Sequence, residues 1–223
     1  MHAQATIDPS LQNETTMHFD HFAYAGRDLD ALVERFERLS GVRPQFGGRH
    51  PGRGTMNALA SLGGEVYLEL LALDPSQSGG QGPKGRGIAK LTQPCLFFYM
   101  LKSSRLDDAR DTMRRHGIAA ELSDASRQTP DGGTLRWRLL VPADDNPFGS
   151  MTPNCIDWLD SVHPATTSIA GCSFASFEMG HPEPEPLRAL LADLGAEVTV
   201  HRADRPFMRL AIRTPNGPLL LTG

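Results

Sequence analysis

His21 is the first residue whose type and setting point to chemistry. It lies in the run from Phe19 to Ala25, where bulky residues of high β propensity predict a strand. Strict alternation along that strand places the imidazole on the same face as Phe19, Ala23 and Ala25. His21 is therefore a candidate catalytic residue. The alternative is a core histidine whose ring is satisfied by a backbone carbonyl.

Glu69 is the second candidate, because it interrupts the apolar run from Val66 to Leu73. That run predicts a fully buried strand, where a carboxylate is costly unless a cation or hydrogen-bond donors compensate it. A buried Glu69 suggests a metal or a polar substrate beside it. On an edge strand with one solvated face, Glu69 would instead be an ordinary surface residue.

Arg49 and His50 belong to a segment rich in glycine and proline, from Gly47 to Gly52. Such a composition predicts a loop with fixed turns, whose charged side chains overhang the mouth of a cleft. A guanidinium binds carboxylate or phosphate groups through two parallel hydrogen bonds. We therefore predict that Arg49 and His50 bind substrate. The alternative is a solvated surface loop.

Four further residues are candidates for substrate binding. Asn57 lies on a predicted strand, and Arg127 lies in a predicted loop just before a hairpin. Arg136 and Trp137 are neighbours within the strand Thr134 to Val141, so their side chains point to opposite faces. Alternation leaves open which of the two faces the cleft.

Three glycines reveal the organisation that must position these residues. Gly41, Gly117 and Gly195 are 76 and 78 residues apart, and each follows a stretch with apolar residues at helical spacing. Glycine is typical of a helix end because the residue there often adopts the left-handed conformation. Asp131-Gly132 and Asn216-Gly217 are hairpin signals. Each copy is therefore predicted to be a βαβββ module.

We predict an α+β fold built from repeated modules. Modules 17–75 and 94–160 form one domain, residues 17–165, and residues 166–223 add a third C-terminal βαβββ module. The polar residues 1–16 lack the basic start and apolar middle of a signal peptide, so they are predicted to be a disordered tail.

Composition limits the function classes. A content of 39% hydrophobic and 22% charged residues is ordinary for a soluble globular protein, and a net charge of −4 argues against nucleic-acid binding. No apolar run is long enough to span a membrane. The three cysteines form no disulfide or metal-knuckle pattern and are typical of a reduced, cytoplasmic protein. Segments Asp74–Gly87 and Ser161–Ser168 lack periodicity and are predicted linkers.

Several motifs, in this order, resemble the glyoxalase-like domains of the vicinal oxygen chelate superfamily. The resemblance covers Phe19 to Ala165. The motifs are the strand with His21, the helix that begins at Asp28-Leu29-Asp30, the segment 47–59, Tyr67-Leu68-Glu69-Leu70-Leu71, Ser126-Arg127, Leu135-Arg136-Trp137-Arg138-Leu139, Ile156-Asp157-Trp158 and His163-Pro164.

This resemblance implies that two paired modules form a curved eight-stranded sheet around a cleft. Enzymes of the family commonly bind a divalent metal there as a Lewis acid, through His or Glu residues of the first and last strands of each module. By position, His21, Glu69 and Asp157 are the implied ligands, whereas Phe98 replaces the fourth. This set suits Mn²⁺, Fe²⁺, Zn²⁺ or Ni²⁺. Equally, the missing ligand is consistent with a site that has lost its metal.

The leading hypothesis is a glyoxalase-like enzyme of the lyase, isomerase or dioxygenase type, with His21 and Glu69 as catalytic residues and no nucleotide cofactor. The rival is a metal-free protein that binds or sequesters a small molecule, a reading favoured by Phe98. An unpaired third module would expose a sheet edge and an apolar face, so residues 166–223 are predicted to form a homodimer contact. Neither nucleic acid nor a membrane is an expected partner, and the substrate is not identified.

Overall fold

The computed structural model describes residues 16–77, 82–129 and 132–223. The predicted tail, residues 1–16, lies almost entirely outside the described residues. The first module consists of β1 (His18–Ala25), α1 (Leu29–Ser40), β2 (Gln45–His50), β3 (Thr55–Ser61) and β4 (Tyr67–Leu73).

The second module repeats this order of elements. It consists of β5 (Cys95–Lys102), α3 (Leu106–Arg115), β6 (Ala120–Gln128), β7 (Thr134–Pro142) and β8 (Asn154–Asp157). Short 3₁₀ turns precede and follow β8, η2 (Gly149–Met151) and η3 (Pro164–Thr166). Between the modules, a helix that the sequence analysis missed, α2 (Pro83–Ala89), begins within the predicted linker Asp74–Gly87 and ends just after it.

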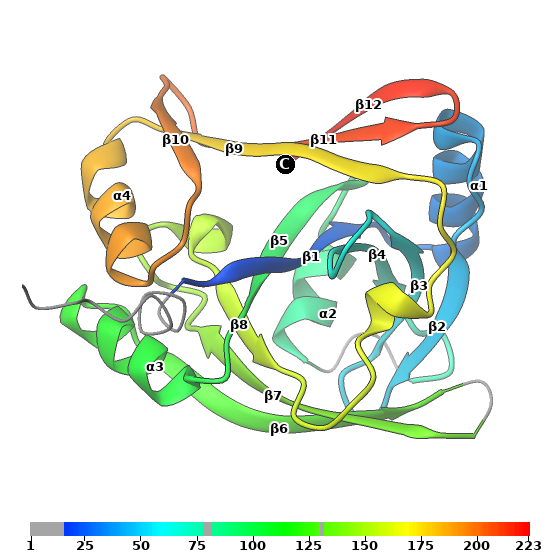
Figure 1. Cartoon of the computed structure of the whole chain (residues 1–223), viewed down its shortest axis with the longest axis horizontal. Coiled ribbons are helices and arrows are strands. Elements are labelled where there is room, and N and C mark those ends of the chain that lie inside the picture. The colour runs from blue at the N-terminus through cyan, green and yellow to red at the C-terminus, as the bar shows by residue number, and fades with distance from the viewer. Residues whose placement is uncertain (1–15, 78–81, 130–131) are drawn as a thin grey trace, which may run out of the picture.

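The two modules share one eight-stranded sheet in the order β2-β3-β4-β1-β5-β8-β7-β6. Their first strands, β1 and β5, pair antiparallel at the centre, and each pairs in parallel with the last strand of its own module. The sheet curls until its edge strands β2 and β6 come into contact (Figure 1). The predicted α+β fold and the curved eight-stranded sheet are confirmed.

The third unit has the predicted order of elements but connects its strands differently. It comprises β9 (Ser173–His181), α4 (Pro184–Asp193), β10 (Thr199–Arg202), β11 (Phe207–Thr214) and β12 (Gly217–Thr222). They form a separate four-stranded sheet in the order β10-β9-β11-β12. In the first two modules the opening strand pairs with the fourth strand, whereas β9 pairs with the second and third.

The helix ends follow from the sequence. In α1, the carboxylate of Asp28 accepts a hydrogen bond of 2.9 Å from the backbone N–H of Ala31, which caps the N-terminus. Gly41 ends the same helix at φ 78°, and Gly117 and Gly195 also have positive φ. The predicted left-handed glycines are therefore present at all three positions.

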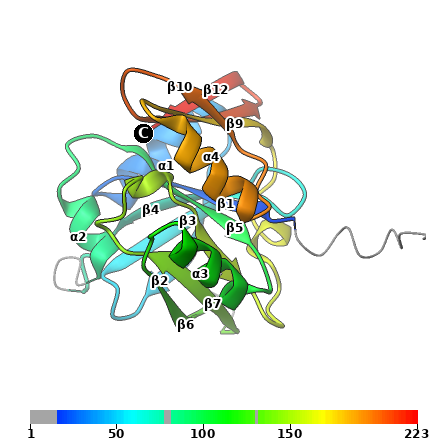
Figure 2. The same cartoon turned by 90° about the vertical axis from the view of Figure 1, so that its left-hand side faces the viewer.

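The two faces of the large sheet are covered differently. Helices α1 and α3 and the four-stranded sheet pack on the outer face, and Figure 2 shows the small sheet as a layer of its own on that side. Phe174 and Phe177 of β9 contact Phe22 of β1, with ring centroids 5.7 and 5.0 Å apart. The inner face, on the concave side, carries a separate apolar cluster, which includes Ala23, Trp137, Ile156 and Trp158.

The docking of the third unit bears on the predicted homodimer contact. Its apolar residues, among them Phe177, Met179 and Leu210, are buried in the same core as Phe22 and Tyr99 of the large sheet. The exposed apolar face on which the dimer prediction rested is therefore covered by the same chain. None of the described helices is long and apolar enough to cross a membrane.

Candidate functional site

A β-bulge at Asp20 sets the geometry of the site. Along β1, Phe19 pairs with Leu101 and His21 pairs with Met100, so Asp20 is an extra residue without a partner on β5. Phe19 consequently turns outward to Phe174 and Phe177 and does not share a face with His21. The alternation expected from the sequence is wrong at this point. One inserted residue moves the side chains that precede it in the strand to the opposite face of the sheet.

Asp20 is fully buried and accepts three side-chain hydrogen bonds. Its Oδ1 lies 2.5 Å from Nδ1 of His21, and its Oδ2 lies 2.8 Å from both Trp158 Nε1 and His163 Nε2. Burial raises the pKa of Asp20, but the hydrogen bonds and charges of His163 and His21 lower it more, to about 2. Asp20 is therefore a carboxylate throughout the physiological pH range.

The same bonds assign the tautomers of both histidines. Nδ1 of His163 accepts the backbone N–H of Ala165 at 3.2 Å, so its proton lies on Nε2, which donates to Asp20. The carboxylate of Asp20 can only accept, so Nδ1 of His21 also carries a proton. The lone pair of neutral His21 is then on Nε2, which faces Glu69 Oε2 at 3.7 Å.

Aromatic rings fix the plane of the His21 imidazole. Tyr67 stacks on it with centroids 4.6 Å apart, and Phe98 approaches it edge-on at 6.2 Å. Burial raises the pKa of Tyr67 well above its usual value, so its hydroxyl stays protonated. Phe98, the residue at the implied fourth ligand position, thus forms part of the wall that orients His21.

Glu69 on β4 is buried and held by an amide. Asn57 Nδ2 donates to Glu69 Oε1 at 2.7 Å and lies 3.3 Å from His50 Nε2. His50 Nδ1 lies 2.9 Å from the hydroxyl of Thr55. Burial lowers the pKa of His50, with Glu69 opposing the shift, which is consistent with a neutral ring that accepts from Asn57.

Gly47 provides the space for this amide. A Cβ on Gly47 would lie 2.5 Å from Asn57 Oδ1 and 2.9 Å from Leu59 Cγ. Among the described residues, Asn57 Oδ1 is the one buried side-chain oxygen or nitrogen without a hydrogen-bond partner. Asn57 therefore directs its N–H groups to Glu69 and His50 and leaves its acceptor against the bare backbone of β2.

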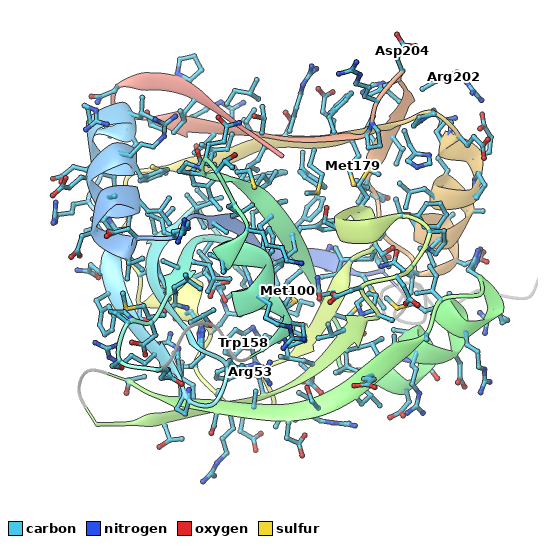
Figure 3. The ribbon with its side chains drawn as sticks, turned by 180° about the vertical axis from the view of Figure 1, so that it is seen from behind. Arg53, Met100, Trp158, Met179, Arg202 and Asp204 are labelled. Atoms are coloured by element: carbon cyan, nitrogen blue, oxygen red, sulfur yellow. The ribbon has the colours of Figure 1, made fainter. Side chains whose placement is uncertain are left out.

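These side chains line a cavity of about 110 Å³ on the concave side of the sheet, which we call the inner cavity. Figure 3 shows Arg53, Met100 and Trp158 gathered within the curve of the large sheet, whereas Met179 lies in the layer between the two sheets. The lining combines aromatic and aliphatic walls with His21, His50, Asn57, Glu69 and three basic side chains, Arg53, Lys84 and Arg127.

The three basic residues make the inner cavity suitable for an anion. Lys84 Nζ lies 3.4 Å from the ring centroid of Phe98 and donates to Asn154 Oδ1 at 3.1 Å. Burial lowers the pKa of Lys84 to about 7, although Glu69 opposes the shift. Burial likewise lowers the pKa of Arg53 and Arg127, but a guanidinium remains charged.

Six of the predicted site residues line the inner cavity: His21, His50, Asn57, Glu69, Arg127 and Trp137. Trp137 faces the cavity, which decides the alternative left open by strand alternation, and Arg136 points away from it. Arg127 lies on strand β6 and not in the predicted loop. Arg49 lies outside the cavity, where it forms an ion pair with Asp74 and donates to Ser76 Oγ at 3.0 Å.

Asp157 does not join the other two implied metal ligands. Its neighbours Ile156 and Trp158 line the inner cavity, whereas Asp157 accepts the backbone N–H of Leu159 at 3.0 Å on the other side of β8. Within residues 16–77, 82–129 and 132–223, no group of three His, Cys, Asp or Glu residues is arranged to hold a metal ion. The residues present therefore do not fit the implied three-ligand site.

Sequence reasoning missed four contributors to the site. Asp20 was hidden by the bulge, and Lys84 lies in a Gly- and Pro-rich segment without periodicity. Arg53 directly follows the glycine-rich segment that contains Arg49, and that composition was the available signal. His163 entered the sequence analysis within the motif His163-Pro164 without an assigned role; it caps η3 and also bonds Asp20.

Solved structures with a similar fold are distant in sequence. A hypothetical protein from Staphylococcus aureus is 16% identical, with a TM-score of 0.60 over 92% of this chain and 85% of that one. Methylmalonyl-CoA epimerase in complex with methylmalonyl-CoA and NH4+ is 20% identical, with a TM-score of 0.49 over 65% of this chain and 96% of that one. The first similarity supports the fold alone.

The sequence itself carries the family assignment. No curated protein matches the chain. Residues 19–195 match the family described as glyoxalase-like domain, which is well over half of the chain. The match extends beyond Ala165, where the resemblance ended in the sequence analysis, and includes β9 and α4. The chain belongs to the glyoxalase-like domain family.

Proposed function

We propose that the protein catalyses proton transfer on a small anionic carbonyl compound, as an isomerase or lyase, with His21 and Glu69 as its acid–base pair. One observation carries this proposal. The Asp20 carboxylate holds His21 in the tautomer whose Nε2 lone pair faces the inner cavity, 3.7 Å from a second proton acceptor on Glu69. A buried imidazole that is fixed by a carboxylate and opposed by another titratable group is typical of general acid–base catalysis.

The basic residues supply the complementary binding. Arg53 and Arg127 are placed to hold the carboxylate of a substrate in the inner cavity, and Lys84 lies on the wall formed by Phe98. Ammonium and guanidinium groups in a largely apolar cavity stabilise negative charge more strongly than they do in water. Such a cavity favours the state in which charge develops on a carbonyl oxygen.

The proposed step is removal of a proton from the carbon beside the carbonyl. The C–H bond breaks, His21 Nε2 gains the proton, and the electron pair moves to the carbonyl oxygen to give an enolate. Asp20, with its pKa of about 2, then stabilises the imidazolium. His21 then returns the proton to another position or face, directly or after passing it from Nε2 to Glu69 Oε2, 3.7 Å away, and this completes an isomerisation.

Assistance by Mn²⁺, Fe²⁺, Zn²⁺ or Ni²⁺ is the finer hypothesis taken from the family resemblance. It has less support than proton transfer, because Asp157 faces away from His21 and Glu69. No step of the proposed reaction depends on a metal. The test is elemental analysis of protein purified without a histidine tag or chelator. Near-stoichiometric metal that is lost in Glu69→Ala would overturn the metal-independent mechanism.

A second candidate is a protein that binds a small molecule without chemistry. The observation that favours it is the aromatic lining of the inner cavity, formed by Tyr67, Phe98, Trp137 and Trp158. Binding of a ligand in that cavity without any proton exchange would support this alternative.

Self-association through residues 166–223 and a cytoplasmic location remain predictions of the sequence. The burial of Phe177 and Leu210 against the chain's own large sheet weakens the physical argument for self-association. Light scattering with the purified protein tests it. A monodisperse monomer across a wide concentration range would contradict the dimer.

Deuterium incorporation tests the proposed reaction without knowledge of the product. Unbranched 2-oxo acids from three to ten carbons are incubated with the protein in D₂O, and loss of the proton signal beside the carbonyl is followed by NMR. We expect exchange above the uncatalysed rate for at least one acid, its loss in Arg127→Ala, and its retention in Arg138→Ala, whose guanidinium lies beside Asp107 of α3 and Asp124 and does not line the cavity. Binding without exchange for every acid would contradict the proposal.

A further inference from the structure

A much larger hollow lies next to the inner cavity. The outer groove, as we call it, has a volume of about 710 Å³ and is bordered by β2, β7 and the segment 159–168. Arg127 lines both hollows. Leu59 and Leu135 line the groove, each two strand positions from a cavity residue, Asn57 and Trp137 respectively. Since residues i and i+2 share a face, the inner surface of the sheet continues from the cavity into the groove.

Exposed apolar side chains are concentrated in this groove. Among the described residues, five large hydrophobic side chains are exposed, and three of them border the outer groove: Phe46 at 49%, Leu159 at 53% and Val162 at 62% relative accessibility. Single exposed apolar residues need no explanation, but a group of them around one concavity is typical of a binding surface.

The wall of the groove is held in place by specific contacts. Leu159 has φ 53°, the one positive value among the described residues other than glycine, and its N–H is bound by Asp157. Ser161 Oγ donates to the carbonyl of Arg136 and accepts its N–H, both at 2.8 Å. A strained backbone that displays leucine to solvent persists because the surrounding structure enforces it. This gives Asp157 a positioning role beside the groove.

The volume of the inner cavity limits what it can hold. A cavity of about 150 Å³ accommodates benzene, whereas the inner cavity has about 110 Å³. It therefore has room for a carboxylate and an adjacent carbonyl but not for a larger substituent as well. Any further part of a substrate bound there must leave the cavity, and the groove beyond Arg127 is apolar enough to receive it.

We propose that the outer groove binds the apolar chain of an amphipathic substrate, a medium-chain or aryl-substituted 2-oxo acid, whose carboxylate and carbonyl occupy the inner cavity. This inference rests on the proposed function. Arg127, at the boundary, pairs with the carboxylate, while Phe46, Leu159 and Val162 cover the chain. Burial of each methylene contributes about three- to fourfold in affinity.

Calorimetric titration with the same 2-oxo acids, from three to ten carbons, measures this contribution. We expect Kd to fall about threefold per added methylene once the inner cavity is filled. Phe46→Ser and Val162→Ser should flatten this dependence and leave the Kd of the three-carbon acid unchanged. Leu220→Ser, an equally exposed apolar residue on the four-stranded sheet, is the matched control and should retain the full dependence.

The outcomes separate this inference from the function on which it rests. Binding of the three-carbon acid with no gain for longer acids overturns the inference and leaves the proposed function standing. A length dependence that survives in both Phe46→Ser and Val162→Ser, or is lost in Leu220→Ser, also overturns it. Failure of every acid to bind overturns both.

Discussion

The two faces of the eight-stranded sheet are made by the same strands but differ in character. The outer face carries apolar packing, whereas the inner face carries the charged groups of the candidate site. On β1, Phe22 packs outward into an aromatic cluster with Phe174 and Phe177, whereas Asp20 and His21 turn toward Trp158 and Glu69. The outer face gains stability from burial of apolar area. The inner face buries charge, and the carboxylates of Asp20 and Glu69 are tolerated there because each accepts hydrogen bonds. We therefore expect substitutions on the two faces to affect stability and the proposed chemistry separately.

Asp20→Asn should have the largest effect, and it acts on the inner face. With an amide in place of the carboxylate, Nδ1 of His21 need not carry a proton. The ring can then adopt the other tautomer, in which Nε2 is protonated and has no lone pair with which to accept a proton. We expect deuterium exchange of a bound 2-oxo acid to fall by about 10²- to 10⁴-fold. Exchange at the wild-type rate in a folded Asp20→Asn protein would remove Asp20 from the mechanism.

Phe177→Ala is the matching change on the outer face. Phe177 is buried against Phe19, Phe22 and Tyr99, so its truncation leaves a cavity between the two sheets. The free energy of unfolding in urea should decrease by about 3–5 kcal/mol. Exchange per folded molecule should stay within about threefold of wild type. A large loss of exchange in the folded fraction would show that the faces are coupled.

Acid should weaken the protein through the inner face. The pKa of Asp20 is lowered from 3.8 to about 2, since the bonds from His163 and His21 outweigh the effect of burial. A carboxyl group with a lowered folded-state pKa stabilises the fold above its unfolded-state pKa, so about 2 kcal/mol is present above pH 4 and is lost as the pH falls through 2. Urea unfolding between pH 5 and 2 measures this loss, which Asp20→Asn should not show.

Gly47→Ala tests how closely the inner face is packed. The added Cβ collides with Asn57 Oδ1 and Leu59, so Asn57 must move away from Glu69. We expect a loss of about 1–3 kcal/mol in the free energy of unfolding. The cost should shrink in a Gly47→Ala, Asn57→Ser double variant, because serine vacates the space. Equal costs in the two backgrounds would contradict this packing.

Lys84 should make anion binding depend on pH, with the smallest effect of the series. Because its pKa is lowered to about 7, mainly by burial, Lys84 is charged below pH 7 and loses its charge above it. The Kd of the three-carbon 2-oxo acid should rise by up to about tenfold per pH unit above 7. Lys84→Arg should abolish this rise, since guanidinium stays charged. A Kd independent of pH in the wild type would exclude a contribution from Lys84.

Sequence patterns predicted the outer face better than the inner one. Amphipathic helices and left-handed glycines such as Gly41 follow from local periodicity, and so does the βαβββ order. The strand order of the third unit was not predictable in this way, because pairing partners depend on contacts distant in sequence. The docking of β9 on β1 is such a contact.

The candidate site was predicted where one residue type carried the signal. A carboxylate inside an apolar strand marked Glu69, and its burial is observed. Asp20 and Lys84 gave no comparable signal. A bulge rotates Asp20 inward, and a short helix in a segment without periodicity carries Lys84 to the cavity. Strand alternation likewise did not exclude Asp157 as a metal ligand. Which face of the sheet Asp157 occupies is set by the pairing of β8 with β7.

In the proposed reaction, His21 removes a proton from a bound 2-oxo acid. The most direct measurement is the rate of deuterium exchange at saturating acid for wild type and His21→Gln, with Kd determined on the same samples. We expect a fall of at least about 10²-fold in exchange, with Kd changed by less than about threefold. Exchange by His21→Gln at the wild-type rate would contradict it.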